Sequence, residues 1–148
     1  MAERATSTAL GYTLTLAISA LLVTGLVVAG SSFVEDQREV VIRNELEVVG
    51  EQVASQLEQA DRLVGSSSDL RALHIDQTIP DTVVDNTYDV LLSPGGEIEL
   101  RTFDPDVSVT VDVTLTSAVV DSSASGGRIV VRCATPTCTS GDLVISND

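Results

Sequence analysis

Two cysteines and one histidine are the side chains best suited to chemistry in this sequence. Cys133 and Cys138 flank Ala-Thr-Pro-Thr, so their spacing is not the Cys-x-x-Cys of a redox pair. In an oxidising compartment such a pair predicts a disulfide, which stabilises a short loop by about 2 kcal/mol. A zinc site needs about four ligands. Because His74 is the only histidine, we expect no metal centre.

His74 also limits the enzyme mechanisms that the chain can support. It lies between Leu73 and Ile75, and no Gly-x-Ser-x-Gly nucleophile motif is present. A hydrolase triad would have to use this one histidine. We therefore expect no enzyme activity and no cofactor, with His74 in a structural or solvent-exposed position.

Aspartates recur in the second half of the chain, at Asp81, Asp85 and Asp89 and again at Asp104 and Asp106. Calcium takes about six to eight oxygen ligands, which carboxylates can supply. The spacing is not that of an EF-hand loop. We therefore interpret these residues as a solvated acidic surface rather than a calcium site.

The overall charge excludes one class of partner. The chain has 148 residues and a net charge of −14, and its eight basic residues are all arginine. Nucleic-acid binding needs clustered basic residues, whereas these arginines are scattered, so we expect no nucleic-acid partner. At about 1 M salt the Debye length is about 3 Å, and acidic surface charges then hardly repel one another. The composition thus indicates a halophilic protein, and the alternative is an ordinary acidic protein from a genome biased toward arginine.

A long apolar stretch stands at the N-terminus of the chain. From Ala5 to Val34 it contains no charged residue, so we expect the rest of the fold to be arranged around it. About 20 apolar residues suffice to cross a bilayer. We therefore predict a head at 1–5 and a transmembrane helix at 6–34. The alternative, a cleaved secretory signal, has an apolar region of about 7–15 residues, which is shorter. The positive charge at the N-terminus favours a cytoplasmic N-terminus and an extracellular remainder.

An amphipathic helix is predicted at 35–68. Its apolar residues follow steps of three and four, which place them on one face. They are Ile42, Leu46, Val49, Val53, Leu57, Ala60 and Val64. No proline interrupts Thr6 to Val64, so we expect one continuous helix from about Ser7 to Val64, ended by Gly65 to Ser68. Gly50 would either bend this helix or permit close approach of a neighbour.

The remainder, 69–148, is predicted to be an extracellular antiparallel β domain. Residues 107–115 alternate apolar and polar side chains, which is the clearest strand pattern in the chain. We expect five short strands in one meander, with a further strand or turn at 73–79 and a loop at 122–127. The predicted strands are 88–92, 97–103, 107–115, 128–133 and 142–146. The fold class is thus α+β, a long N-terminal helix packed on a small antiparallel sheet.

This architecture resembles that of type IV pilins, and the residues at the head of the apolar stretch extend the likeness. Ser7, Ala9, Leu10 and Gly11 match the pattern at the start of haloarchaeal pilins, although Thr8 stands where proline is usual. The resemblance is specific over about residues 4–29 and architectural beyond. It implies cleavage by a prepilin peptidase between Ala5 and Thr6, with Thr6 heading the mature helix.

Small residues in the apolar stretch predict a surface for helix–helix contact, because they allow two helix backbones to approach closely. We expect these bundle contacts at Ala17, Ala20, Gly25 and Ala29. The polar residues Thr13, Thr15 and Thr24 are expected to bond back to helix carbonyls and so to be compatible with a membrane.

Two functions follow from these observations. The first is a structural subunit of an archaeal pilus-like filament or its assembly, a minor pilin or pseudopilin that contacts the lipid bilayer and other pilin-like subunits through its helix. The second is a membrane-anchored extracellular binding module that does not polymerise. A secreted enzyme lacks the residues it would need.

Overall fold

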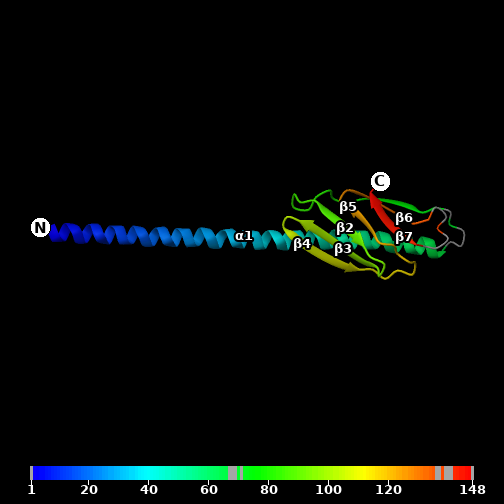
Figure 1. Ribbon diagram of the computed structural model, residues 1–148, viewed down its shortest axis with the longest axis horizontal. Coiled ribbons are helices and arrows are strands. Elements are labelled where there is room, and N and C mark those ends of the chain that lie inside the picture. Colours follow the sequence, from blue (N-terminus) through cyan, green and yellow to red (C-terminus); the bar gives the residue numbers. More distant parts are fainter. Residues whose placement is uncertain (1, 67–69, 71, 136–137, 139–141, 148) are drawn as a thin grey trace. The chain divides into compact units, whose positions relative to one another are not determined.

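The computed structural model describes residues 2–66, 70, 72–135, 138 and 142–147, and for residues 2–9 the backbone only. The chain divides into two units, Met1–Arg38 and Glu39–Asp148. The helix α1 (Ala2–Ser66) supplies the described residues of the first unit and the helical part of the second (Figure 1). The continuous helix is confirmed. Ser67 and Ser68 of the predicted terminator lie outside the described residues.

Beyond α1, the described residues of the second unit include seven strands. They are β1 (His74–Thr78), β2 (Tyr88–Leu92), β3 (Glu97–Phe103), β4 (Asp106–Asp112), β5 (Ser122–Ser125), β6 (Arg128–Cys133) and β7 (Leu143–Asn147). They form two antiparallel sheets, one in the order β1-β6-β7 and the other in the order β4-β3-β2-β5. The α+β class and the packing of a helix on antiparallel sheets are confirmed, whereas the single five-stranded meander is wrong.

The strand β5 explains most of that error. Its sequence Ser-Ser-Ala-Ser was expected to be a loop, but it pairs with β2, with Val90 opposite Ala124. Ala124 is its one buried side chain, while Ser123 and Ser125 face outward. A strand that needs one small inward residue has little hydrophobic pattern, so tertiary pairing outweighs local propensity here.

Other boundaries shifted by a few residues. The segment at 73–79 is a strand, β1, paired with β6. The predicted strand at 107–115 begins one residue earlier and ends at Asp112, so Asp106 belongs to the strand rather than to the turn. The turn itself contains a cis peptide bond between Asp104 and Pro105.

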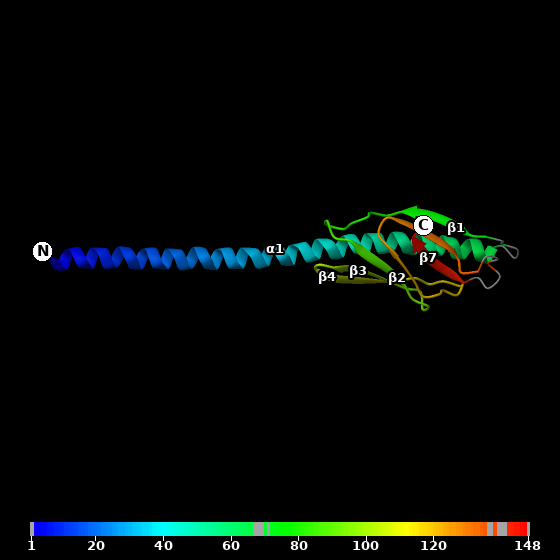
Figure 2. The same ribbon diagram turned by 45° about the horizontal axis from the view of Figure 1, so that its top comes forward.

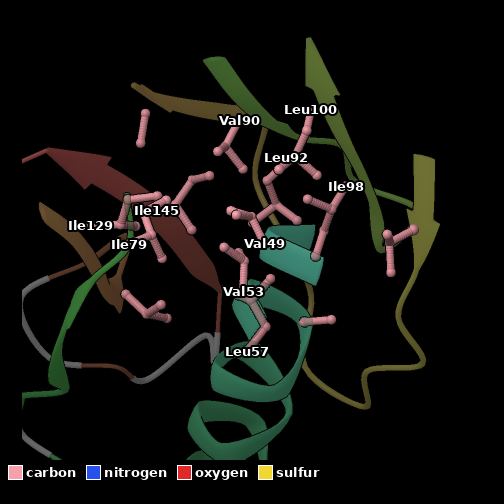
Figure 3. Close-up of a cluster of buried hydrophobic side chains, with 14 of the residues drawn as sticks. Val49, Val53, Leu57, Ile79, Val90, Leu92, Ile98, Leu100, Ile129 and Ile145 are labelled. Carbon is pink, nitrogen blue, oxygen red and sulfur yellow. The ribbon is translucent and has the colours of Figure 1, made fainter. Parts of the chain in front are cut away.

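The core lies between the amphipathic part of α1 and the two sheets (Figures 1 and 2). Six of the seven residues of the predicted apolar stripe, Ile42 to Ala60, are at most 4 % exposed, and Val64 packs against the same cluster. Figure 3 shows Val49, Val53 and Leu57 facing the inward side chains of both sheets. The predicted stripe is therefore confirmed as the helical side of the core.

At Gly50 the helix α1 packs closely against strands β3 and β4 of the four-stranded sheet. A Cβ placed there would lie 2.8 Å from Val111 Cγ2 and 2.9 Å from Leu100 Cδ1. The glycine therefore serves a close approach to strands of its own unit rather than a bend in the helix.

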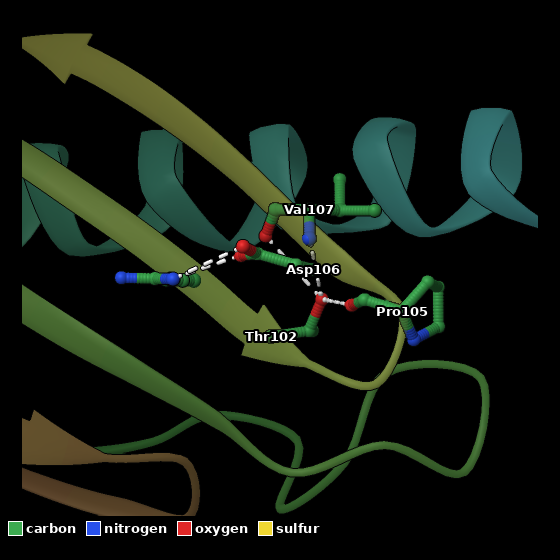
Figure 4. A network of polar contacts seen from close by, with 5 residues as sticks. Thr102, Pro105, Asp106 and Val107 are labelled. Carbon is green, nitrogen blue, oxygen red and sulfur yellow. Dashed lines mark hydrogen bonds and ion pairs between the residues drawn. The ribbon is translucent and has the colours of Figure 1, made fainter.

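A buried threonine fixes the hairpin between β3 and β4 (Figure 4). The Thr102 hydroxyl donates to the Pro105 carbonyl at 2.7 Å and accepts from the Val107 N–H at 3.3 Å. Thr102 is fully buried, and an unpaired hydroxyl there would cost about 1–3 kcal/mol. The polar side chain is thus satisfied by the turn that it organises.

Candidate membrane helix and interaction surfaces

The first unit presents apolar side chains on every side. The large hydrophobic residues from Leu10 to Val34 are at least half exposed, and Leu26 reaches 75 %. Among the described residues, α1 is the helix that is long and apolar enough to cross a membrane. The residues described in this unit form no buried core among themselves, so its apolar surface is suited to a membrane span or to contact with other helices.

The serine and threonine hydroxyls from Thr13 to Ser32 are paired within the helix. Thr15 donates to the Gly11 carbonyl at 2.9 Å, and Thr24 donates to the Ala20 carbonyl at 2.8 Å. Thr13, Ser19, Ser31 and Ser32 bond back in the same way. The predicted back-bonding of Thr13, Thr15 and Thr24 is confirmed. Each hydroxyl can therefore enter an apolar medium without losing its partner.

The small residues proposed for helix contacts all lie in this unit and are solvent-exposed: Ala17, Ala20, Gly25 and Ala29. A Cβ on Gly25 would meet no atom within 4 Å. This surface is open to close approach by another helix, and its use remains a prediction. Ala5 and Thr6 both lie within α1, and cleavage between them also remains a prediction.

The second unit contains an apolar groove between α1 and the loop that precedes β2. We call it the valine groove, and its volume is about 480 Å³. Its lining residues are Val41, Asn44, Glu45, Val48, Val49, Pro80, Thr82 and Val83. Glu45 is the one charged residue among them. Val48 is 68 % exposed, the largest value among the large hydrophobic side chains described in this unit.

One wall of the valine groove ends in a strained turn. Val83 and Asn86 exchange two backbone hydrogen bonds of 2.8 and 2.9 Å around Val84 and Asp85. Val84 has φ 48° and Asp85 has φ 66°. A β-branched residue is a rare occupant of this left-handed region. The Asn86 amide donates to the Val84 carbonyl at 3.0 Å and so helps to hold the turn.

The two cysteines form a disulfide, Cys133–Cys138, as the sequence predicts. Cys133 ends β6, and both cysteines are nearly buried. The Ala134 N–H donates to the Asp142 carbonyl at 2.8 Å and continues the pairing of the two strands one residue past Cys133. The disulfide thus ties the end of β6 to Cys138, within the segment that leads to β7.

The side chains considered for catalysis or metal binding do not converge. His74 is exposed on β1, and its Nε2 lies 3.2 Å from Asp76 Oδ2. The other carboxylate oxygen, Asp76 Oδ1, lies 3.0 Å from Arg128 Nη2. Asp89 accepts from the Ser125 hydroxyl, and Asp106 pairs with Arg101. Within the described part of the chain, no three of the residues His, Cys, Asp and Glu are grouped so as to hold a metal ion.

Sequence reasoning missed a carboxylate that ties α1 to the segment after β4. Asp61 accepts the Ser117 N–H at 2.7 Å and the Thr116 N–H at 3.0 Å. Burial raises the pKa of this carboxyl, but the hydrogen bonds from Ser117 and Thr116 outweigh burial and hold the pKa below its ordinary 3.8. No local pattern pairs residues 55 positions apart, so only the fold reveals this contact.

Tyr88 is a second buried polar group near the valine groove. Its hydroxyl donates to the Pro80 carbonyl at 2.6 Å, and the residue is 1 % exposed. Burial, together with the negative charge of Asp81, raises the pKa of Tyr88 to about 12. The phenol therefore stays protonated and anchors the start of the groove-lining loop.

The class of protein defined by these features is a small α+β domain whose long N-terminal helix also carries an uncovered apolar segment. The chain belongs to a family of unknown function, DUF7266, whose model matches residues 1–145. No curated protein and no solved structure matches it.

Proposed function

We propose that the chain is a structural subunit of an archaeal type IV pilus-like filament or of its assembly, in the manner of a minor pilin or pseudopilin. The observation that carries the proposal is the difference in burial between the two parts of α1. Its residues 10–34 expose apolar side chains, whereas its stripe from Ile42 to Val64 is part of the domain core. A subunit that moves from a membrane into a filament needs such a helix.

The proposal places the N-terminus in the cytoplasm, one helix in the cell membrane and the second unit outside the cell. The disulfide supports the outside location, because disulfides persist in oxidising compartments. The acidic, lysine-free composition supports a high-salt setting. In this account the lipid bilayer and other pilin-like subunits are partners of the helix, through Ala17, Ala20, Gly25 and Ala29.

A second function is favoured by the valine groove. An open apolar groove on a domain held at a membrane is suited to binding a partner, even if the chain never polymerises. The alternative is therefore a permanently anchored surface module. The two proposals differ in whether the head at 1–5 is removed by a prepilin peptidase and in whether the chain leaves the membrane.

The experiment that separates them determines the N-terminus of the native chain by mass spectrometry, in membranes and in sheared surface material. A chain that begins at Thr6 and occurs in the sheared fraction supports the filament subunit. A chain that begins near Met1 and stays in membranes supports the anchored module. As a matched pair, Ala5→Leu is expected to block cleavage, whereas Ala9→Leu, beyond the junction, leaves the N-terminus unchanged.

A further inference from the structure

We infer that the valine groove of one copy receives Phe103 and Arg101 of a second copy. The inference rests on the proposed function, because the contact is small and needs copies held close together. Both surfaces belong to the second unit, and Phe103 and Arg101 are not among the residues that line the groove in their own chain. Each chain therefore offers both halves of the contact.

The inserted half of the contact is an exposed aromatic ring. Phe103, at the end of β3, is 62 % exposed and is the largest exposed apolar side chain described in the second unit. An exposed phenylalanine gains free energy when a partner buries it, since its ring carries about 150–250 Å² of surface. It is therefore the strongest apolar anchor that this domain presents.

Arg101 holds a fixed position beside that ring. Its Cζ lies 5.8 Å from the centroid of Phe103, and its Nε and one Nη group donate to the Asp106 carboxylate at 3.0 and 3.1 Å. A side chain that is already ordered loses less entropy on binding. The bonds to Asp106 use Nε and Nη2, so Nη1 can donate to an acceptor on a second copy.

The lining of the valine groove is chemically suited to Phe103 and Arg101. Val41, Val48, Pro80 and Val83 supply an apolar lining for the ring. Glu45 is the charged residue of the lining and is solvent-exposed, so it can accept from the Arg101 guanidinium. Insertion of the Phe103 ring would supply the affinity, and the Arg101–Glu45 pair would fix the orientation of the second copy.

Because the two halves are different surfaces, the contact is heterologous and can repeat from copy to copy. A single inserted ring buries less than the roughly 1,000 Å² of a stable interface between free proteins. Confinement in one bilayer or filament raises the effective concentration enough for such a contact to form. The contact therefore suits neighbouring subunits and not a dimer in dilute solution.

The test uses the full chain in lipid vesicles, with the photo-crosslinking analogue p-benzoyl-phenylalanine in place of Phe103. Irradiation is expected to give a covalent dimer whose attachment maps to 41–49 or 80–83. The same analogue at Leu91, which is 38 % exposed on the same sheet, is expected to give little of this product. Attachment elsewhere, or no dimer from position 103, would overturn the inference.

A pair of groove variants completes the test. Val48→Asp is expected to lower the yield of dimer by about tenfold, because it places a charge against the inserted ring. Val40→Asp is the matched control, since Val40 is half exposed but does not line the groove. Equal yields from the two variants, with equal melting temperatures, would contradict the contact.

A third position separates this inference from the proposed function. The analogue at Leu22, in the apolar first unit, reports association of the helices alone. A dimer from Leu22 but not from Phe103 would overturn the groove contact and leave the filament subunit standing. The absence of a dimer at both positions would contradict both proposals.

Discussion

Residues 10–34 and residues 42–64 of α1 share one backbone conformation but differ in the environment of their apolar side chains. In the first segment the apolar side chains surround the helix and remain exposed. In the second they follow one stripe, which the two sheets cover. Helix geometry alone therefore does not set the environment of a residue. Periodicity does, because a stripe fits a folded core while an all-round apolar surface fits only an apolar medium or other helices.

The largest expected effect comes from placing a charge in the covered segment. Val53 is 2 % exposed and packs between the sheets. Val53→Asp should destabilise the second unit by about 4 kcal/mol or more, because the carboxylate is buried without a partner. Thermal unfolding of the full chain measures this loss. Glu51→Ala, on the exposed face two residues away, is the control and should be nearly neutral. Equal melting temperatures would refute the packing of the helix on the sheets.

The converse substitution places a charge in the uncovered segment. Val27 is 66 % exposed in the first unit. Val27→Asp should leave the melting temperature of the second unit unchanged. It should reduce membrane insertion, since an aspartate at the centre of a membrane helix costs about 2.5–3.5 kcal/mol. The membrane-bound fraction after extraction measures the effect. A lower melting temperature with intact membrane binding would reverse the roles assigned to the two segments.

Two glycines give a finer comparison. Gly50→Ala should destabilise the second unit by about 1–2 kcal/mol, since the added Cβ would overlap Val111 and Leu100 and this overpacking exceeds the gain in helix propensity. Gly25→Ala meets no atom within 4 Å and should not lower stability. Denaturant unfolding of both variants is the measurement. A stabilised Gly50→Ala variant would show that the sheet can move away from the helix at little cost.

The smallest expected effect concerns the Asp61 carboxylate and its dependence on pH. The hydrogen bonds from Thr116 and Ser117 lower its pKa in the folded chain, so its contribution is complete above the unfolded-state pKa and is lost as the pH falls through the folded-state value. Asp61→Asn should cost about 1 kcal/mol at pH 7, because an amide replaces one acceptor with a donor. The difference from the unchanged chain should shrink below about pH 4.

Glu58→Gln is the control for that pH profile. Glu58 pairs with Arg62 at 3.0 Å on the exposed face of the same helical turns, and the Arg62 side chain is 78 % exposed. Surface pairs of this kind contribute about 0.5 kcal/mol or less. Unfolding measured from pH 7 to pH 3 should therefore separate the two variants. A constant difference between Asp61→Asn and the unchanged chain at all pH values would contradict the role of the carboxylate charge.

Much of the fold could be predicted because its signals are local. The stripe from Ile42 to Val64 is set by helical periodicity, and β3 and β4 are set by alternation of apolar residues. The division into two sheets could not be predicted, since β1 pairs with β6 and β5 pairs with β2 across long stretches of chain.

The candidate surfaces also differ in whether neighbouring residues in the sequence determine them. The disulfide and the back-bonded hydroxyls depend on near neighbours in sequence and were predicted. The Asp61 contact and the valine groove bring together residues far apart in the chain, so only the assembled fold could reveal them.

We expect residues 10–34 to lie in an apolar medium, while the exposed face of the second unit remains in water. The most direct test is the collision accessibility of a spin label, measured by electron paramagnetic resonance on the full chain in lipid vesicles. A label at Val27→Cys is expected to be accessible to oxygen and protected from a water-soluble nickel reagent, whereas a label at Leu91→Cys, on the exposed side of β2 and away from the valine groove, shows the opposite order. High accessibility of position 27 to the nickel reagent would contradict the account.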